Sequence, residues 1–422
     1  MSLLRWEWKK IWQGRGWMLP VALAAILLLS AIVNFAGLRP ALNGTLRRVN
    51  GETRAFWGQP VTQEVRDAAL PRLESLGAAV KKESWGSVSC DISPVMEQYG
   101  PDSYEMNAAV LWSMLLDAPT LEEDRQNYED MLLAEKEAAR DDPEALAILQ
   151  AREARRKDPA AWYVAPSTSA WTQFLNPGNY GALMAGLVTL ALMILLLSDS
   201  FAREQGSLGA ISLIQPKSRR WLHAKILCAA LSGALIAASL SLGLLFVYGL
   251  VYGFQGGTIG ALSSLGLYGY VYGELVADVP CWQLAALLIL ARACCGACLG
   301  VILSACSALT RRAPAAAALF LGLVLALLSL MVLEGAYFTN PAHMQQAVDS
   351  EGLAALTLTP VRLFLNPEIF TARFERLPSA YGNERLFNVL LAGDLRWKFA
   401  GVVAGITALF WALAALCGRR RA

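Results

Sequence analysis

The chain has 422 residues, of which 55% are hydrophobic and only 17% are charged, and its mean hydropathy is +0.41. An ordinary soluble domain is about 45–50% apolar and about 25% charged. Because the extra apolar residues are gathered into long runs, the composition excludes a soluble multidomain enzyme, a secreted disulfide scaffold and a disordered regulator. The 36 Lys and Arg against 34 Asp and Glu leave a net charge of +2.

Six runs are long and apolar enough for membrane helices, which need about 20 mostly apolar residues. Backbone groups in lipid must bond within the protein, so we expect an all-α integral membrane protein. A signal peptide is the alternative for the first run, but its core of about 19 residues exceeds a usual h-region and no small-x-small cleavage site follows. The predicted transmembrane helices are 17–36, 180–198, 226–253, 282–309, 313–333 and 399–417.

Lys and Arg are concentrated in the N-terminal segment, in the segment 199–225, at Arg311 and Arg312, and in the tail 418–422. These segments carry 14 cations and three acids, and six spans place all of them on one side. Cationic loops stay in the cytoplasm. We therefore predict a plasma-membrane protein with both termini in the cytoplasm.

Residues 37–177 are predicted to form an extracytoplasmic domain with 15 cations and 22 acids. Thr120 is a suitable N-cap for a helix that begins at Leu121, and a second helix is expected over 144–157. The segment has no run of alternating strand residues, so we expect a mostly helical domain. Its five tryptophans favour core packing and a belt at the membrane surface over a ligand platform; they are Trp57, Trp85, Trp112, Trp162 and Trp171.

Two further outer segments are predicted. The segment 254–281 is rich in Gly and aromatic residues and has no Lys or Arg, which is typical of a flexible interfacial loop. The segment 334–398 is amphipathic and mixed in charge.

The sequence has no catalytic constellation. Its only histidines are His223 and His343, which excludes a His-Glu-x-x-His zinc peptidase, and the dipeptide Gly-Lys of a P-loop is absent. Cys295 and Cys298 have Cys-x-x-Cys spacing, but in an apolar helix without other ligands we interpret them as packing residues. We therefore predict no enzyme activity, no metal and no cofactor. Whether the outer thiols Cys90 and Cys281 pair is left open.

Arg292 is the one charge well inside a predicted span. Charges at this depth are costly and usually face protein or water. Glu334, at the outer end of the next span, is the predicted partner. The pair either fixes helix packing or lies in a transport path.

Residues 1–16 predict a cytoplasmic interfacial helix. Leu4, Trp8, Ile11 and Trp12 share one face at helical spacing, flanked by cations. Amphipathic basic helices of this kind lie at the lipid headgroups. The predicted anchors are Trp6, Trp8 and Trp12.

The segment 199–225 is predicted to contain the end of a helix that leaves the membrane, a short second helix and a break at Pro216. A cationic stretch then leads back into the membrane. Apolar side chains on a charged cytoplasmic helix suit docking into a groove of another protein. The residues assigned to this contact are Phe201, Arg203, Glu204, Gly206, Leu208, Ile211, Pro216 and Arg219.

Taken together, these features make the sequence resemble the permease subunits of type-2 ABC exporters. The resemblance rests on the N-terminal helix, the six spans, the first outer domain, and a pattern after span two: Phe201, Glu204, Gly206, Pro216, Ser218, Arg219 and Lys225. It implies that 199–225 is a coupling loop that contacts a separately encoded ABC ATPase. It also implies a second permease chain, so that ATP binding by two ATPases moves the spans between two arrangements.

The partners expected are therefore an ABC ATPase subunit, a second permease chain and membrane lipid, with no nucleic acid. The alternative is a non-transporting membrane sensor or assembly scaffold whose outer domain is a receptor. An intramembrane enzyme is the weakest alternative, and the substrate stays open among lipids, peptides, antibiotics and ions.

Overall fold

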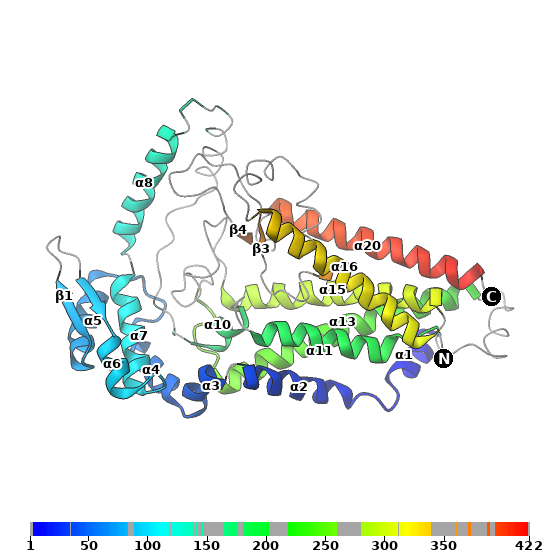
Figure 1. The fold of residues 1–422 in the computed structure, drawn as a ribbon, viewed down its shortest axis with the longest axis horizontal. Coiled ribbons are helices and arrows are strands. Elements are labelled where there is room, and N and C mark those ends of the chain that lie inside the picture. Colours follow the sequence, from blue (N-terminus) through cyan, green and yellow to red (C-terminus); the bar gives the residue numbers. More distant parts are fainter. Residues whose placement is uncertain are drawn as a thin grey trace.

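A computed structural model describes residues 3–33, 35–82, 88–118, 120–138, 168–175, 180–201, 218–259, 280–310, 312–338 and 393–420, with short pieces between 140 and 166 and between 360 and 388. The described chain is mostly helical with little sheet. It consists of a bundle of long apolar helices and a smaller polar domain at one end of the bundle (Figure 1).

The bundle has two central helices and four flanking ones. Helices α13 (Ser218–Tyr252) and α15 (Cys281–Thr310) are in contact along the centre. The others lie beside them: α2 (Met18–Val33), α11 (Tyr180–Leu197), α16 (Ala313–Phe338) and α20 (Gly393–Arg420). The N-terminal helix α1 (Leu3–Trp12) and the end of α20 lie at the same end of the bundle, which we call the basic end (Figure 1).

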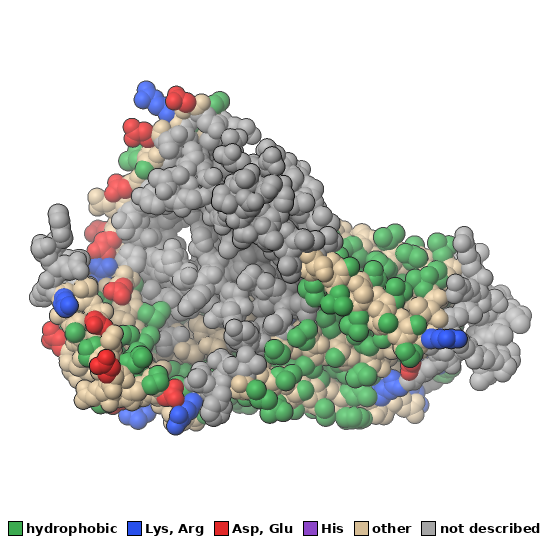
Figure 2. Space-filling view, in the orientation of Figure 1, with side chains coloured by type: hydrophobic (Ala, Val, Ile, Leu, Met, Phe, Trp, Pro, Cys, Tyr) green, Lys and Arg blue, Asp and Glu red, His purple; other side chains and the backbone are tan. Residues whose placement is uncertain are grey.

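Three of the described helices are long and apolar enough to cross a membrane, over Arg220–Tyr252, Cys281–Thr310 and Ala400–Cys417. Three shorter apolar stretches lie at Met18–Ile32, Met184–Leu197 and Ala313–Ser329. The outer face of α13 is apolar along its length, with Leu227, Leu235, Phe246 and Leu250 exposed. Figure 2 shows the visible bundle surface as mostly hydrophobic, with charges at its basic end and over the polar domain. Exposed apolar surface on this scale is compatible with an integral membrane protein.

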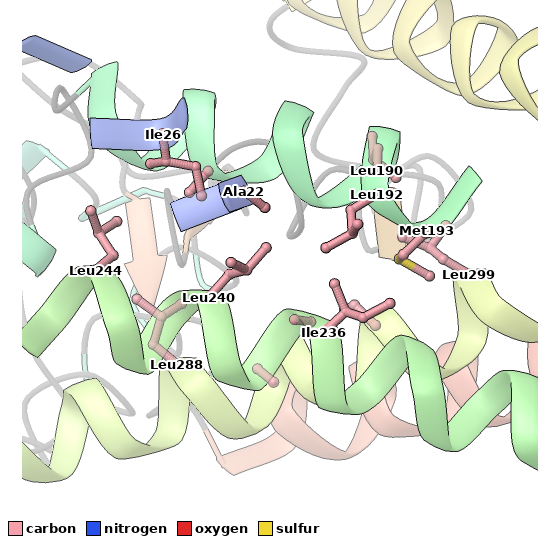
Figure 3. Close-up of a cluster of buried hydrophobic side chains, with 14 of the residues drawn as sticks. Ala22, Ile26, Leu190, Leu192, Met193, Ile236, Leu240, Leu244, Leu288 and Leu299 are labelled. Carbon is pink, nitrogen blue, oxygen red and sulfur yellow. The ribbon is translucent and has the colours of Figure 1, made fainter. Parts of the chain in front are cut away.

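The bundle core lies between α2, α11, α13 and α15. Figure 3 shows side chains from these helices meeting there, and Ile26, Met193, Ile236 and Leu288 are all nearly inaccessible. Each comes from a helix with almost no charged residues, so its burial follows from close packing between helices rather than from an amphipathic pattern.

Glycine permits the closest contact between α13 and α15. A Cβ atom on Gly233 would lie 2.2 Å from the carbonyl oxygen of Gly296, and one on Gly296 would lie 2.5 Å from that of Gly233. One turn along, a Cβ on Gly300 would lie 2.4 Å from the carbonyl oxygen of Ala229. Small residues let helix backbones approach in this way when helices associate in lipid.

The polar domain is built from short helices and one strand pair. Its elements are α3 (Phe35–Leu42), α4 (Thr45–Glu52), η1 (Arg54–Phe56), α5 (Gln63–Ser75), β1 (Ala79–Lys82), β2 (Val88–Asp91), α6 (Ser93–Tyr99), α7 (Tyr104–Asp117) and α8 (Leu121–Ala138). Val65, Leu73, Val95 and Leu115 lie in its own hydrophobic core.

Antiparallel strands are the feature of this domain that sequence patterning missed. β1 and β2 pair in the register Ala79↔Asp91 to Lys82↔Val88. The strands are only four residues each, too short for an alternating pattern to be visible. A second antiparallel pair, β3 (Phe370–Ala372) and β4 (Leu386–Asn388), lies within the predicted segment 334–398.

The predicted start of helix α8 is confirmed. Thr120 Oγ1 accepts a hydrogen bond from Glu123 N at 3.4 Å, and Thr120 N donates to Glu123 Oε2 at 2.9 Å. This reciprocal arrangement is a capping box. Most of the second predicted helix, 144–157, lies outside the described residues, as do Trp85 and Trp162.

Helix α10 (Ala170–Leu175) and residues 253–259 join the polar domain to the bundle. Ala170 N donates to the carbonyl oxygen of Gly253 at 2.9 Å, and Trp171 Nε1 donates to that of Phe254 at 3.0 Å. Gly253 follows the last residue of α13 with φ 85°, a left-handed conformation that suits glycine after a helix. Trp112 is buried in the polar-domain core, so these tryptophans serve packing and junction contacts.

Helix boundaries correct two predicted loops. The last eight residues of the predicted loop 199–225 are the first eight of α13, because the helix starts soon after Pro216 rather than at the edge of the apolar run. Likewise α16 continues to Phe338, beyond the predicted end at 333. Helices extend past apolar runs because hydrogen bonding along the backbone does not depend on the polarity of the side chains.

Candidate functional site

The candidate site is a cluster at the basic end that holds both ends of the segment 202–217. Its residues come from four places: Glu7 on α1, Ser198 and Phe201 after α11, Trp221 and Lys225 on α13, and Ser307 on α15. We call these six residues the basic-end cluster.

A serine on α15 fixes the position where the chain leaves α11. Ser307 Oγ donates a hydrogen bond to the carbonyl oxygen of Ser198 at 2.7 Å and accepts one from Phe201 N at 3.1 Å. Ser198 and Ser307 are both buried. The hydroxyl thus satisfies two backbone groups beyond the end of helix α11, which would otherwise lack intrahelical partners.

The chain returns next to the point where it left. Lys225 is 3% exposed, and its Nζ lies 4.8 Å from the ring centroid of Phe201 and 4.7 Å from that of Trp221. A cation over an aromatic face is attracted by the ring quadrupole, more strongly when water is excluded. Phe201 and Lys225 therefore hold the two ends of segment 202–217 together.

A carboxylate on α1 completes the cluster. Glu7 is 3% exposed, accepts a hydrogen bond from Trp221 Nε1 at 2.9 Å and forms an ion pair with Lys10 Nζ at 3.2 Å. A buried carboxylate needs such partners because desolvation alone would be costly. The N-terminal helix is thereby connected to the first turns of α13.

The apolar face of α1 packs on α13. Trp12 Nε1 donates to Ser232 Oγ at 3.0 Å, and Trp8 lies 5.9 Å from Trp12 between ring centroids. Trp8 and Trp12 are half-buried and contact α13 on one side, so their role as membrane anchors stays a prediction. Trp6 is exposed, with Lys10 Nζ 3.3 Å from its ring centroid. Trp6 likewise remains a predicted lipid anchor.

His223 is also bound within the basic end. Its Nδ1 accepts a hydrogen bond from Trp411 Nε1 of α20 at 3.0 Å, and the two rings stack with an interplanar angle of 18°. Helix α20 is thus tied to the same turn of α13 that carries Trp221. Among the described residues, no group of three or more metal-binding side chains is present.

Most of the residues predicted to contact an ATPase lie outside the described residues: Arg203, Glu204, Gly206, Leu208, Ile211 and Pro216. Phe201 is placed in the cluster, and Arg219 lies in the first turn of α13, with a side chain that is not described. The structure adds Glu7, Trp221, Ser198 and Ser307. Glu7 could have been found as the one acid in residues 1–16, whereas the serines give no pattern in sequence.

Arg292 lies inside the bundle as predicted. It is 4% exposed, and its Cζ lies 5.6 Å from the ring centroid of Phe174 on α10. Glu334 lies in α16, but its side chain is not described, so the predicted pair with Arg292 remains a prediction. Cys295 and Cys298 are buried free thiols, and no disulfide joins Cys90 to Cys281.

Comparisons of this chain with protein families, with curated proteins and with solved structures find no match. What the cluster can do must therefore be argued from its geometry. It contains no nucleophile with a general base beside it and supports no covalent step. It joins the residue before segment 202–217, Phe201, to α13 and α15, and it joins α13 to α1.

Proposed function

We propose that this chain is the membrane-spanning permease subunit of an ABC transporter of the exporter type. It would move a substrate across the membrane with ATP that a separate nucleotide-binding subunit hydrolyses. The observation that carries the proposal is the basic-end cluster. A segment between two apolar helices is held at both ends by buried contacts, and a docking segment that transmits force needs such anchoring.

The proposed topology has six spans. In it α2, α11, α13, α15, α16 and α20 cross the membrane, the basic end faces the cytoplasm and the polar domain lies outside. The clustering of 14 cations at the basic-end segments supports this orientation. The 15 cations of residues 37–177 do not oppose an outer location, because long segments translocate largely regardless of their charge.

In the proposed mechanism, ATP binding closes a pair of ATPase subunits and moves the segment 202–217. Phe201 passes this displacement to α15 through Ser307 and to α13 through Lys225. Trp221 and Glu7 extend it to α1, so that the bundle changes between two packed arrangements. The permease itself carries out no covalent chemistry, and a second permease chain completes the transporter.

The decisive experiment is to look for an ABC ATPase in the reading frames beside this chain and to co-purify the two proteins, followed by vanadate-sensitive ATP hydrolysis in proteoliposomes. We expect a stable complex. Glu204→Ala and Gly206→Trp should lower stimulated hydrolysis at least about tenfold, the effect of losing roughly 1.4 kcal/mol of coupling. Leu133→Ala, an exposed position on α8, is the control and should leave hydrolysis unchanged.

Two results would contradict the proposal. A complex whose hydrolysis and transport survive both substitutions would show that 202–217 is not the coupling segment. Absence of any ATPase partner would favour a membrane sensor or scaffold instead.

A further inference from the structure

Arg292 offers a buried positive charge without a described counter-charge. It is the twelfth residue of α15, about 17 Å along the helix from Cys281 at 1.5 Å per residue. Its Nε and Nη2 atoms are buried and have no hydrogen-bond partner among the described residues. A guanidinium cannot lose its charge at this depth, and it normally has its planar donors satisfied.

The surroundings of this guanidinium are apolar. Leu284, Leu288, Cys295 and Leu299 share its face of α15 at helical spacing, and all are buried. Phe174 of α10 lies against it from the junction with the polar domain. Tyr248 of α13 also interacts with it electrostatically, but a neutral phenol does not balance its charge.

We propose that Arg292 binds the anionic head of an amphiphilic molecule, a carboxylate or phosphate attached to an apolar chain. The donors Nε and Nη2 lie on one edge of the guanidinium, and this edge matches two oxygens of either head group. The neighbouring side chains are apolar, so they favour an anion that carries a hydrocarbon chain over a small hydrated anion. The inference rests on the proposed function, because it names the class of molecule that the permease would move.

Binding is tested on the purified full-length chain in phosphatidylcholine nanodiscs, with radiolabelled laurate as the probe. Unlabelled dodecyl phosphate should compete with it, whereas dodecanol and dodecyltrimethylammonium, which have the same chain length, should not. Acetate and inorganic phosphate should not compete either. Competition by these small ions at equal concentration would overturn the assignment to an amphiphile, and competition by dodecanol would show that the charge is not used.

Substitutions locate the site. Arg292→Gln should weaken laurate binding at least about tenfold, the loss expected for a bidentate charge-assisted contact. Arg292→Lys should bind with intermediate affinity, because it keeps the positive charge but loses the two coplanar N–H donors of the guanidinium. Thermal unfolding of each variant is measured beside binding, and unchanged affinity in folded Arg292→Gln or Arg292→Lys protein would overturn the proposal.

Glu334→Gln distinguishes the two possible partners of Arg292, which are the Glu334 carboxylate and an anionic ligand. If the guanidinium is open to ligand, this substitution leaves laurate affinity unchanged. A tenfold gain in affinity would show that the Glu334 carboxylate already occupies Arg292, and would overturn the proposal. No ATPase or transport enters these measurements, so their failure is distinct from failure of the proposed function.

Discussion

Glu52 stabilises the polar domain through a network of side-chain hydrogen bonds. Its carboxylate accepts from Arg72 Nε at 3.0 Å and Nη2 at 2.8 Å, from Trp112 Nε1 at 2.7 Å and from the Tyr104 hydroxyl. Burial by itself would raise the pKa of Glu52, but the hydrogen bonds from Arg72 and Trp112 and the charge of Arg72 outweigh it, and the pKa is lowered. One residue thereby joins α4, α5 and α7.

We predict that Glu52→Gln lowers the free energy of unfolding of the polar domain by about 1–3 kcal/mol at pH 7, the usual range for hydrogen bonds to a charged group. Because folding lowers the pKa of Glu52, its stabilising contribution is fully present at pH values above the pKa of the unfolded state. This contribution is lost as the pH falls through the pKa of the folded state. The gap between wild type and variant should therefore narrow below about pH 4.5. Urea unfolding of the full chain, followed by tryptophan fluorescence, measures it.

Glu74→Gln is the control for this prediction, because Glu74 is exposed on the same helix as Arg72. It should change stability by less than about 0.5 kcal/mol. Equal effects of the two substitutions, or a gap that widens in acid, would contradict the role assigned to Glu52.

Glu7 is one of the residues that hold helix α1 on α13. We predict that Glu7→Ala loosens this contact, because Trp221 Nε1 loses its acceptor and Lys10 its ion-pair partner. A loss of about 1.4 kcal/mol makes opening of the helix tenfold more frequent. Trypsin cleavage after Lys9 and Lys10 should accelerate by about that factor in proteoliposomes.

Trp6→Ala is the matched control on α1, since its ring is exposed and does not pack on α13. It should leave the cleavage rate at the wild-type value. Rapid cleavage in this variant and slow cleavage in Glu7→Ala would mean that lipid, rather than α13, holds the helix.

The glycine contact between α13 and α15 sets the distance between these helices. We predict that Gly296→Ala lowers the stability of the bundle by about 1–3 kcal/mol, because the added Cβ meets the backbone of Gly233 and no flexible side chain can move away. Thermal unfolding in detergent measures the loss.

Gly322→Ala in α16 has the same change in an apolar helix, but a Cβ there would meet nothing within 4 Å. It should be neutral or stabilising by up to about 1 kcal/mol, since Ala is the better helix former. A drop equal to that of Gly296→Ala would show that the loss does not come from the close contact between α13 and α15.

Elements were predictable from the sequence to the extent that they depend on local signals. Thr120 and Glu123 indicate the start of α8, and the spacing of Trp8 and Trp12 indicates the amphipathic face of α1. The same spacing does not say whether that face meets lipid or α13. The hydrogen bonds of Ser307 and the proximity of Phe201 to Lys225 join residues far apart in the chain, so only the fold reveals them.

At the scale of the whole molecule, the net charge of +2 hides a strong separation of charge. The basic-end segments carry 14 cations and three acids, whereas residues 37–177 carry 15 cations and 22 acids. The bundle between them is apolar over the face that Figure 2 shows. The positive-inside rule concerns the Lys and Arg of short loops near the helix ends, and 14 of these cations belong to the basic-end segments.

The number of spans decides the relation between the two termini. If only the three longest apolar helices cross the membrane, the N- and C-termini lie on opposite sides; if all six apolar helices cross, both lie on the same side. We predict six crossings, because α2, α11 and α16 contact the long helices directly. If these three helices lay outside the membrane, their exposed apolar side chains would face water.

Reporter fusions in a bacterial host test this prediction. Alkaline phosphatase, which is active only outside the cytoplasm, should be active when joined after residues 150, 270 or 350. A fluorescent protein that folds only in the cytoplasm should fluoresce when joined to residue 210 or to the C-terminus, and phosphatase at these sites should be inactive.

Phosphatase activity at residue 210, or fluorescence at residue 150, would contradict the predicted orientation. If the sites at 150 and 210 report the same side, α11 does not cross. Only an even number lets the basic end, with α1 and the end of α20, contact one cytoplasmic partner.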